Sequence, residues 1–314
     1  MTNLYFKDIN SATRHFIAMF QELGNNVKSI NQKNQTTYKK EIVEIRNIFY
    51  TIKNPKACIV SFENNVPNRL WTMCELLTEF LNLNPPIMIK YFPKTLINSY
   101  DMLEDGTVSY TYGSRLQEYH QLLNVYNKLK NNLTSKRCIV QIFMPYDTQP
   151  NALDVPCTVN YHFVCRNNKL DLTVFYRSHD FFKGFKIDMV VSSFVLQVMA
   201  GWLGVEVGEL HILDSSLHYY KTDKNKLETL SEDIRHNYKD STPFVVPRVG
   251  MKDFYIQLRK VKHVEELSNR TSDIYMRQLI EEIKFPFYQD FARVFANRKN
   301  TQFHFATKTF QEWK

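Results

Sequence analysis

The sequence has little of what marks several large protein classes. Its 314 residues include only 8 Gly and 11 Pro, whereas 44% are hydrophobic and 14% are aromatic, so collagen-like and disordered chains are excluded. No uninterrupted apolar stretch reaches the ~18 residues that a membrane span requires. The N-terminus, MTNLYFKDINSATRHF, lacks the apolar core of a signal peptide. The composition predicts a compact soluble protein, long enough for one large domain or two ordinary ones.

Motifs for common cofactors are missing as well. There is no G-x-G-x-x-G or G-x-x-x-x-G-K-S/T, and the nine histidines show neither H-x-x-x-H nor H-E-x-x-H spacing. The five cysteines are an odd number without a C-x-x-C pair, which is typical of a protein in a reducing cytoplasm. These absences argue against dinucleotide-binding folds, P-loop enzymes and zinc hydrolases, and we expect no bound metal.

Positive charge is in excess. Forty Lys and Arg against 32 Asp and Glu give a formal charge of +8 and a pI near 9.0. This balance favours nucleic acid, a membrane surface or small anionic ligands as partners, and a solvated basic surface with no partner is the structural alternative. The basic residues are spread along the whole chain and do not cluster with aromatics, so a nucleic-acid partner is not favoured.

Apolar periodicity predicts both helices and strands. Helical spacing predicts helices over 6–23, 68–83, 114–130, 187–203, 252–267 and 274–284. Short apolar runs predict strands over 41–51, 138–146, 158–163, 170–176 and 207–220, the third and fourth joined as a hairpin. The polar run 25–40 is expected to be an exposed loop, with a flap that covers a ligand as the alternative. No repeat or obvious linker divides the chain, so we predict one α+β domain over 1–314, with helices covering one large sheet.

Four polar stretches lie at the edges of predicted strands. They are Ser135-Lys136-Arg137, Val155-Pro156-Cys157-Thr158, Arg177-Ser178-His179-Asp180 followed by Gly184 and Asp188, and Ser216-Leu217-His218-Tyr219-Tyr220. Each alone has an ordinary structural explanation. Cys157 suits a small buried residue, and Arg177 with Asp180 suits a surface ion pair. His218 suits a histidine at a strand end.

Taken together, over residues 68–220, these stretches resemble the thymidylate synthase family. Pro156-Cys157 matches the family's nucleophile motif, and its phosphate- and pterin-binding motif is matched by Arg177, Ser178, Asp180 and Gly184. Glu75 matches the family's helix glutamate, and Tyr112-Gly113 matches its tyrosine-glycine pair at the substrate. Lys136 and Arg137 match the basic pair that reaches the nucleotide phosphate of the partner subunit. His218 and Tyr220 match the sugar-binding pair. The resemblance implies a thymidylate synthase-like single domain with a large mixed sheet. It also implies a homodimer, formed through that sheet, whose subunits share the phosphate site.

Two departures from the family pattern point to a cytidylate substrate. Asp188 stands where thymidylate synthases have the asparagine that holds the uracil edge. A carboxylate accepts hydrogen bonds from both the amino group and the protonated ring nitrogen of cytosine, whereas uracil offers one donor and one acceptor. Thr158 stands where thymidylate synthases usually have histidine, and both features are similar to the deoxycytidylate hydroxymethylase branch. The structural alternative for Asp188 is a solvated carboxylate at a helix N-terminus.

The resemblance implies a nucleotide hydroxymethyltransferase that converts dCMP or CMP to its 5-hydroxymethyl derivative with methylenetetrahydrofolate and water. Cys157, as a thiolate favoured by Arg177, would add to carbon six of the ring. Glu75 would order or deprotonate the water, and Asp188 would stabilise the ring. No metal is implied.

The remaining roles follow from the same resemblance. The phosphate would be held by Arg177 and Ser178 and by Lys136 and Arg137 of a second subunit. Lys28 or Lys33 could replace the family's N-terminal phosphate arginine. The folate would contact Asp180 and Gly184, the sugar His218 and Tyr220, and the base Tyr112. A thymidylate synthase that methylates dUMP, and a non-catalytic relative that binds nucleotide or RNA, are the alternatives.

Overall fold

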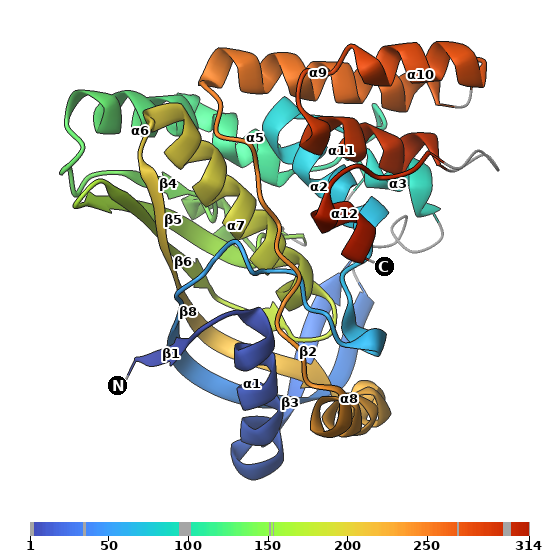
Figure 1. Cartoon of the computed structure of the whole chain (residues 1–314). Coiled ribbons are helices and arrows are strands. Elements are labelled where there is room, and N and C mark those ends of the chain that lie inside the picture. The colour runs from blue at the N-terminus through green and yellow to red at the C-terminus, as the bar shows by residue number, and fades with distance from the viewer. Residues whose placement is uncertain are drawn as a thin grey trace.

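The computed structural model describes residues 3–33, 36–93, 102–150, 152, 154–268, 270–297 and 303–313. An eight-stranded sheet forms its frame, in the order β1-β3-β8-β6-β5-β4, with β2 paired to β3 and β7 to β8 (Figure 1). The strands are β1 (Leu4–Phe6), β2 (Asn25–Lys33), β3 (Thr36–Ile52), β4 (Ile139–Gln141), β5 (Thr158–Arg166), β6 (Lys169–Tyr176), β7 (His179–Asp180) and β8 (Glu206–Tyr220). Three pairs, β1–β3, β6–β8 and β7–β8, are parallel, and the other pairs are antiparallel. The predicted α+β class with a large mixed sheet is confirmed.

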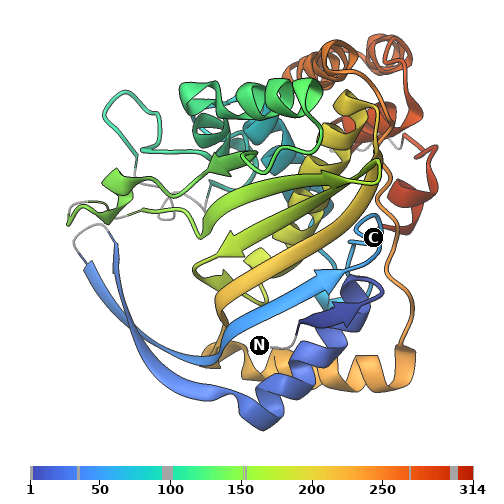
Figure 2. The same cartoon turned by 90° about the vertical axis from the view of Figure 1, so that its left-hand side faces the viewer.

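Helices cover one face of this sheet. They are α1 (Ile9–Leu23), α2 (Arg69–Leu81), α3 (Met88–Tyr91), α5 (Tyr112–Gln117), α6 (Gln121–Asn131), α7 (Gly184–Leu203), α8 (Lys224–Asn237), α9 (Met251–Leu267), α10 (Asp273–Glu281), α11 (Pro286–Ala296) and α12 (Lys308–Glu312). Helix α7 lies along the covered face of the sheet, and α2, α9 and α11 lie farther from the sheet than α7 (Figure 1). Helices α1 and α8 lie at the other end of the sheet. In the part of the chain that the structure describes, no helix covers the opposite face of β3, β8, β6 and β5 (Figure 2).

The central hairpin and α7 form where the sequence predicts them. Asn167 and Asn168 link β5 to β6 with φ of 50° and 60°, a left-handed turn that asparagine tolerates better than most residues. Helix α7 ends at Gly204, whose φ of 73° closes the helix without the penalty of a Cβ atom. By length and composition α7 could cross a membrane. However, 72% of its apolar window is buried inside the protein, as in a core helix.

The structure corrects three predicted elements. The polar run 25–40 is not a loop: its described residues form β2 and the first part of β3, which pair as a long hairpin. The helix predicted over 114–130 is divided into α5 and α6, because Tyr119 and His120 adopt φ of 53° and 55°. The strand predicted over 138–146 is only the short β4.

Candidate active site

Cys157 lies directly before β5, at the end of the sheet where β6 delivers Arg177. The backbone N–H of Arg177 donates to the Cys157 carbonyl at 2.9 Å. The Arg177 guanidinium donates through Nε to the Pro156 carbonyl at 2.8 Å and through Nη2 to the Val155 carbonyl at 3.1 Å. Arg177 therefore holds the backbone of the Cys157 segment in place.

Burial and neighbouring charges determine the pKa of the Cys157 thiol. Burial raises the pKa of Cys157 above its usual range, and the positive charge of Arg177, which lowers it, is not sufficient to reverse the effect. Asp188 raises the pKa further. Arg177 therefore acts in the predicted direction, by lowering the pKa of Cys157, but burial outweighs its effect in the free protein.

Helix α2 directs two carboxyl groups towards the same region. Glu75 is half-buried, and burial, followed by the negative charge of Asp188, raises its pKa to about 8. Glu79 lies one turn later and is only 2% exposed, and its Oε2 has no hydrogen-bond partner among the described residues. Burial raises the pKa of Glu79 well above its usual range. The sequence analysis identified Glu75 and missed Glu79, whose spacing of four residues from Glu75 was the available signal.

Asp188 occupies the second turn of α7 and contacts a buried histidine. Its Oδ2 lies 3.2 Å from Nε2 of His179, an ion-pair distance at an angle that falls short of a hydrogen bond. The negative charge of Asp188 raises the pKa of Glu75, Tyr112 and Cys157. The three predicted catalytic side chains, Glu75, Asp188 and Cys157, therefore interact electrostatically in one region. They come from α2, from α7 and from the segment before β5.

Tyr112 reaches this region from the first turn of α5. Its hydroxyl accepts a hydrogen bond from Thr158 Oγ1 at 3.4 Å, next to Cys157. The turn depends on Gly113, because a Cβ there would lie 2.4 Å from the Thr78 carbonyl of α2. The tyrosine-glycine pair thus permits a close approach of α5 to the helix that carries Glu75.

The predicted sugar- and folate-binding residues meet where β7 pairs with β8. In the β7–β8 register Asp180 stands opposite His218, whose ring lies 5.6 Å from that of Tyr220. Asp180 Oδ1 accepts from the backbone N–H groups of Phe182 and Lys183 at 3.0 and 3.1 Å. Burial lowers the pKa of His218, so the ring is neutral at pH 7. The structure brings these three residues together.

Comparison with known proteins defines the family. The sequence model described as thymidylate synthase matches residues 22–278, which is most of the chain. This chain belongs to the thymidylate synthase family. The thermostable thymidylate synthase A from Bacillus subtilis has a similar fold, with a TM-score of 0.60 and 19% identity over 72% of this chain and 84% of that one. The recognition and the fold predicted from the motifs are confirmed.

Two relatives show how far the sequence similarity extends. The deoxyuridylate hydroxymethyltransferase of Bacillus phage SP01 is 30% identical over 216 residues, 63% of this chain and 55% of that protein. A candidate thymidylate synthase of Methanosarcina acetivorans is 35% identical over 130 residues, 40% of this chain and 59% of that protein. The chain therefore spans only a little over half the length of the relatives it matches.

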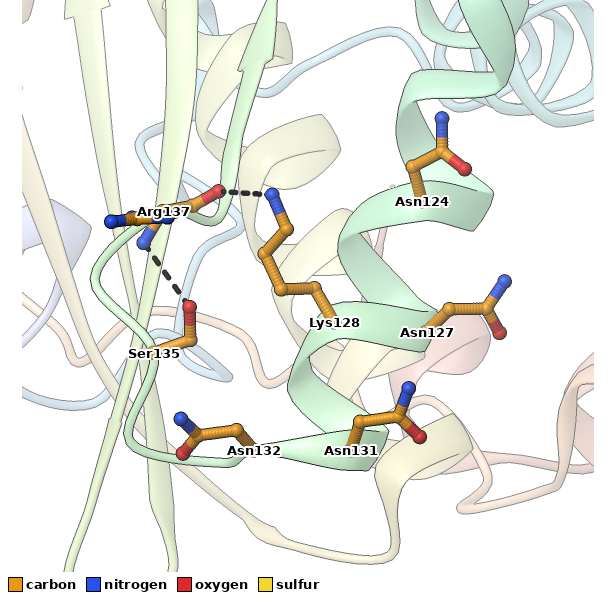
Figure 3. Close-up of a pocket in the computed structure, with 7 residues that line it drawn as sticks. All are labelled: Asn124, Asn127, Lys128, Asn131, Asn132, Ser135 and Arg137. Atoms are coloured by element: carbon orange, nitrogen blue, oxygen red, sulfur yellow. Dashed lines mark hydrogen bonds between the residues drawn. The ribbon is translucent and has the colours of Figure 1, made fainter.

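The basic pair of this thymidylate synthase family member lies away from Cys157. Lys136 and Arg137 are exposed in the turn before β4, beside the far end of β5. Arg137 lines a surface pocket of about 660 Å³ together with Lys128, Ser135 and four asparagines, Asn124, Asn127, Asn131 and Asn132 (Figure 3). This pocket contains none of the predicted catalytic residues. Within one chain the pair does not join the site.

The other predicted residues have simpler outcomes. Ser178 is half-buried between Arg177 and His179. Gly184 is the first residue of α7 and faces the carboxylate of Asp188, because a Cβ there would lie 2.9 Å from Oδ2. The side chains of Lys28 and Lys33 lie outside the described residues. His179, which the motif pattern treats as any residue, is the main group that the sequence analysis overlooked.

Proposed function

We propose that the protein is a nucleotide hydroxymethyltransferase that converts dCMP or CMP to its 5-hydroxymethyl derivative with methylenetetrahydrofolate and water. The observation that supports this substrate best is the Asp188 carboxylate, which interacts electrostatically with Cys157 and Glu75 and lies 3.2 Å from Nε2 of His179. Such a carboxylate accepts hydrogen bonds from the amino group and the protonated ring nitrogen of cytosine, and it repels the carbonyl oxygen of uracil.

In the proposed reaction Cys157 supplies covalent activation. Its sulfur adds to carbon six of the pyrimidine, which makes carbon five nucleophilic enough to attack the one-carbon unit of the folate. The bond between that carbon and the folate nitrogen breaks, and carbon five loses its proton. An exocyclic methylene then remains on the ring. Asp188 stabilises the ring while charge builds on its nitrogen.

Glu75 is suited to the water step that follows. With a pKa of about 8, this carboxyl group exchanges protons near neutral pH, as a general base requires. Glu75 takes a proton from water while the water oxygen bonds to the exocyclic methylene carbon. The carbon–sulfur bond then breaks, so Cys157 leaves as a thiolate and the ring double bond is restored.

The ligand-binding roles complete the proposal. The Arg177 guanidinium and Ser178 bind the nucleotide phosphate, His218 and Tyr220 bind the sugar, and Tyr112 lies at the base. The folate contacts Asp180, whose side chain is 15% exposed and uses only Oδ1 to cap the following turn. Gly184 would contribute to the folate site only indirectly, through the space it leaves.

A homodimer through the uncovered sheet face would complete the phosphate site. On that face Phe49, Leu213 and Phe175 are register neighbours across β3, β8 and β6, and all three are half-exposed. An apolar row on an open sheet face is typical of a protein interface. Lys136 and Arg137 of the second subunit would then bind the phosphate. Leu213→Glu should convert the dimer to a monomer in light scattering and reduce activity with it.

A second candidate is hydroxymethylation of a deoxyuridylate, because the phage relative has that activity in its name. In that case Asp188 would have to present one donor and one acceptor, as a protonated carboxyl does. A thymidylate synthase acting on dUMP and a non-catalytic relative that binds nucleotide or RNA are the remaining alternatives. For each of them we take residues 1–314 as one domain, acting in a reducing cytoplasm, where the five free cysteines persist.

Product analysis tests the proposal directly. The protein is incubated with methylenetetrahydrofolate and, in separate reactions, dCMP, CMP and dUMP, and products are identified by mass spectrometry. We expect 5-hydroxymethylcytidylate from dCMP or CMP. A hydroxymethyl product from dUMP alone would establish the second candidate, and a methyl product with dihydrofolate would establish a thymidylate synthase. No product from any nucleotide would favour a non-catalytic relative.

Two variants test the residue roles. Cys157→Ala should abolish tritium release from carbon five of the nucleotide, and unchanged release would remove Cys157 from its role. Asp188→Asn should shift preference from cytidylate towards uridylate, because an amide matches the donor and acceptor of uracil. Retention of full cytidylate preference in that variant would contradict the specificity argument. Cys58→Ala, which changes a buried cysteine away from these contacts, is the matched control for Cys157→Ala.

A further inference from the structure

His179 is enclosed between two carboxylates from different parts of the fold. It is 1% exposed, with Nε2 3.2 Å from Asp188 Oδ2 on α7 and Nδ1 2.9 Å from Asp214 Oδ1 on β8. Its ring stacks on Tyr176 at 4.1 Å with an interplanar angle of 18°. Residues 179, 188 and 214 therefore form a line of three charged groups that reaches from the sheet interior to the candidate active site.

The inner end of this line is fixed. Asp214 is completely buried, and its Oδ2 accepts a hydrogen bond from the Tyr50 hydroxyl at 3.1 Å. A buried carboxylate is costly unless a cation and hydrogen bonds compensate for its charge, and His179 is the cation available here. Burial alone would lower the pKa of His179, but the charges of Asp214 and Asp188 raise it to about 10. The ring is therefore an imidazolium at neutral pH.

The outer end of the line is fitted to the Asp188 carboxylate. A Cβ at position 184 would lie 2.9 Å from Asp188 Oδ2 and 3.7 Å from His179 Cδ2. Glycine therefore leaves the space in which this oxygen meets the imidazolium. The Asp188 side chain is still 30% exposed, so part of it remains accessible from the site.

We propose that His179, held by Asp214, is a positioning and specificity-determining residue that keeps Asp188 as an oriented carboxylate for recognition of a cytosine edge. The inference rests on the proposed function. One oxygen of Asp188 is engaged by the imidazolium, and the other is left to accept hydrogen bonds from the base. Without the imidazolium, Asp188 Oδ2 loses its charged neighbour, and the carboxylate is no longer held in one orientation towards the base. A carboxylate that is free to turn discriminates less between a cytosine edge, which offers two donors, and a uracil edge, which offers one donor and one acceptor.

Several titratable groups face this line, and they bear on any pH dependence. They are Asp214 and His218 on β8, Tyr50 on β3, Tyr176 on β6, Tyr161 on β5, Glu75 and Glu79 on α2, Tyr112 on α5, and Cys157. The pKa of Glu75 is raised to about 8, which lies within the pH range of such an experiment. The ratio of cytidylate to uridylate activity is therefore the better measure, since a shared titration of Glu75 cancels in it.

The experiment compares wild type with His179→Asn, using kcat/KM for cytidylate and uridylate between about pH 6 and 9. We expect the cytidylate-to-uridylate ratio of His179→Asn to fall roughly 10- to 100-fold, the range for losing one hydrogen bond between the base and the Asp188 carboxylate. The fall should appear at every pH tested. His236→Asn, which removes an exposed histidine of helix α8, is the control.

A double variant keeps the inference testable if His179→Asn folds poorly. His179→Asn/Asp214→Asn also removes the buried carboxylate that the single variant leaves without its cation, so it should fold better than the single variant and show the same reduced ratio. An unchanged, pH-independent ratio in both variants would overturn the role of His179 and leave the proposed function intact. Absence of any cytidylate product from wild type would overturn the proposed function, and this inference with it.

Discussion

The raised pKa that suits Glu75 to act as a base should also make the folded protein less stable as the pH rises. Burial and the charge of Asp188 raise its pKa from 4.5 to about 8. A carboxyl group with a raised pKa binds its proton more tightly in the folded than in the unfolded state. Below about pH 4.5 both states are protonated and there is no penalty. As pH rises from 4.5 to 8 the folded state loses stability relative to the unfolded state, and above pH 8 the loss is constant.

The size of this loss can be bounded from the pKa. A shift from 4.5 to about 8 corresponds to about 5 kcal/mol at pH 8 and above, and to about 3 kcal/mol at pH 7. Glu75 is only half-buried, so solvent screens part of this energy, and we expect roughly half of it. Glu75→Gln has no charge to desolvate and should therefore be about 2–3 kcal/mol more stable than wild type at pH 8.5.

Urea unfolding at pH 5, 7 and 8.5, at one protein concentration, measures this difference. The stability advantage of Glu75→Gln should grow steadily across the series and be smallest at pH 5. Glu232→Gln, which changes an exposed glutamate of α8, is the matched control and should show little difference at any pH. A gap between Glu75→Gln and wild type that is the same at pH 5 and 8.5 would refute the reasoning. It would mean that the proton of Glu75 is not coupled to folding.

Three further predictions follow from the same geometry. Gly184→Ala should reduce kcat/KM for cytidylate about tenfold or more, because the added Cβ collides with Asp188 Oδ2. Unaltered kinetics would show that the Asp188 carboxylate is not fixed beside position 184. Glu79→Met should raise the free energy of unfolding at pH 7 by about 1–3 kcal/mol in urea titrations, since it removes a buried oxygen that has no hydrogen-bond partner among the residues the structure describes. A lower stability would indicate a partner for Glu79. Because the pKa of Cys157 is raised, alkylation of its thiol by iodoacetamide should be slow at pH 7 and should accelerate beyond pH 9. Cys157→Ser gives the background from the other cysteines, and fast labelling of Cys157 at pH 7 would contradict the prediction.

Local sequence signals predicted those elements whose structure depends on neighbouring residues. The hairpin of β5 and β6 requires only alternating side chains and two asparagines, and α7 requires an apolar run closed by Gly204. The run 25–40 was predicted wrongly, because its polar side chains say nothing about pairing. Its strand exists because residues 25–33 register with 36–44. A strand of this kind is decided by its partner, not by its own hydrophobicity.

The sequence by itself determined which chemical groups the protein has and their order along the chain. The thiol of Cys157, the carboxylate of Asp188 and the motif around Arg177 were sufficient to indicate the family, because their types and spacing are properties of the chain alone. Tertiary structure decided how these groups behave. Burial raised the pKa of Cys157 against the effect of Arg177, and β8 placed Asp214 beside His179, 35 residues away. Desolvation and charge pairing depend on distances in space, which no local pattern records.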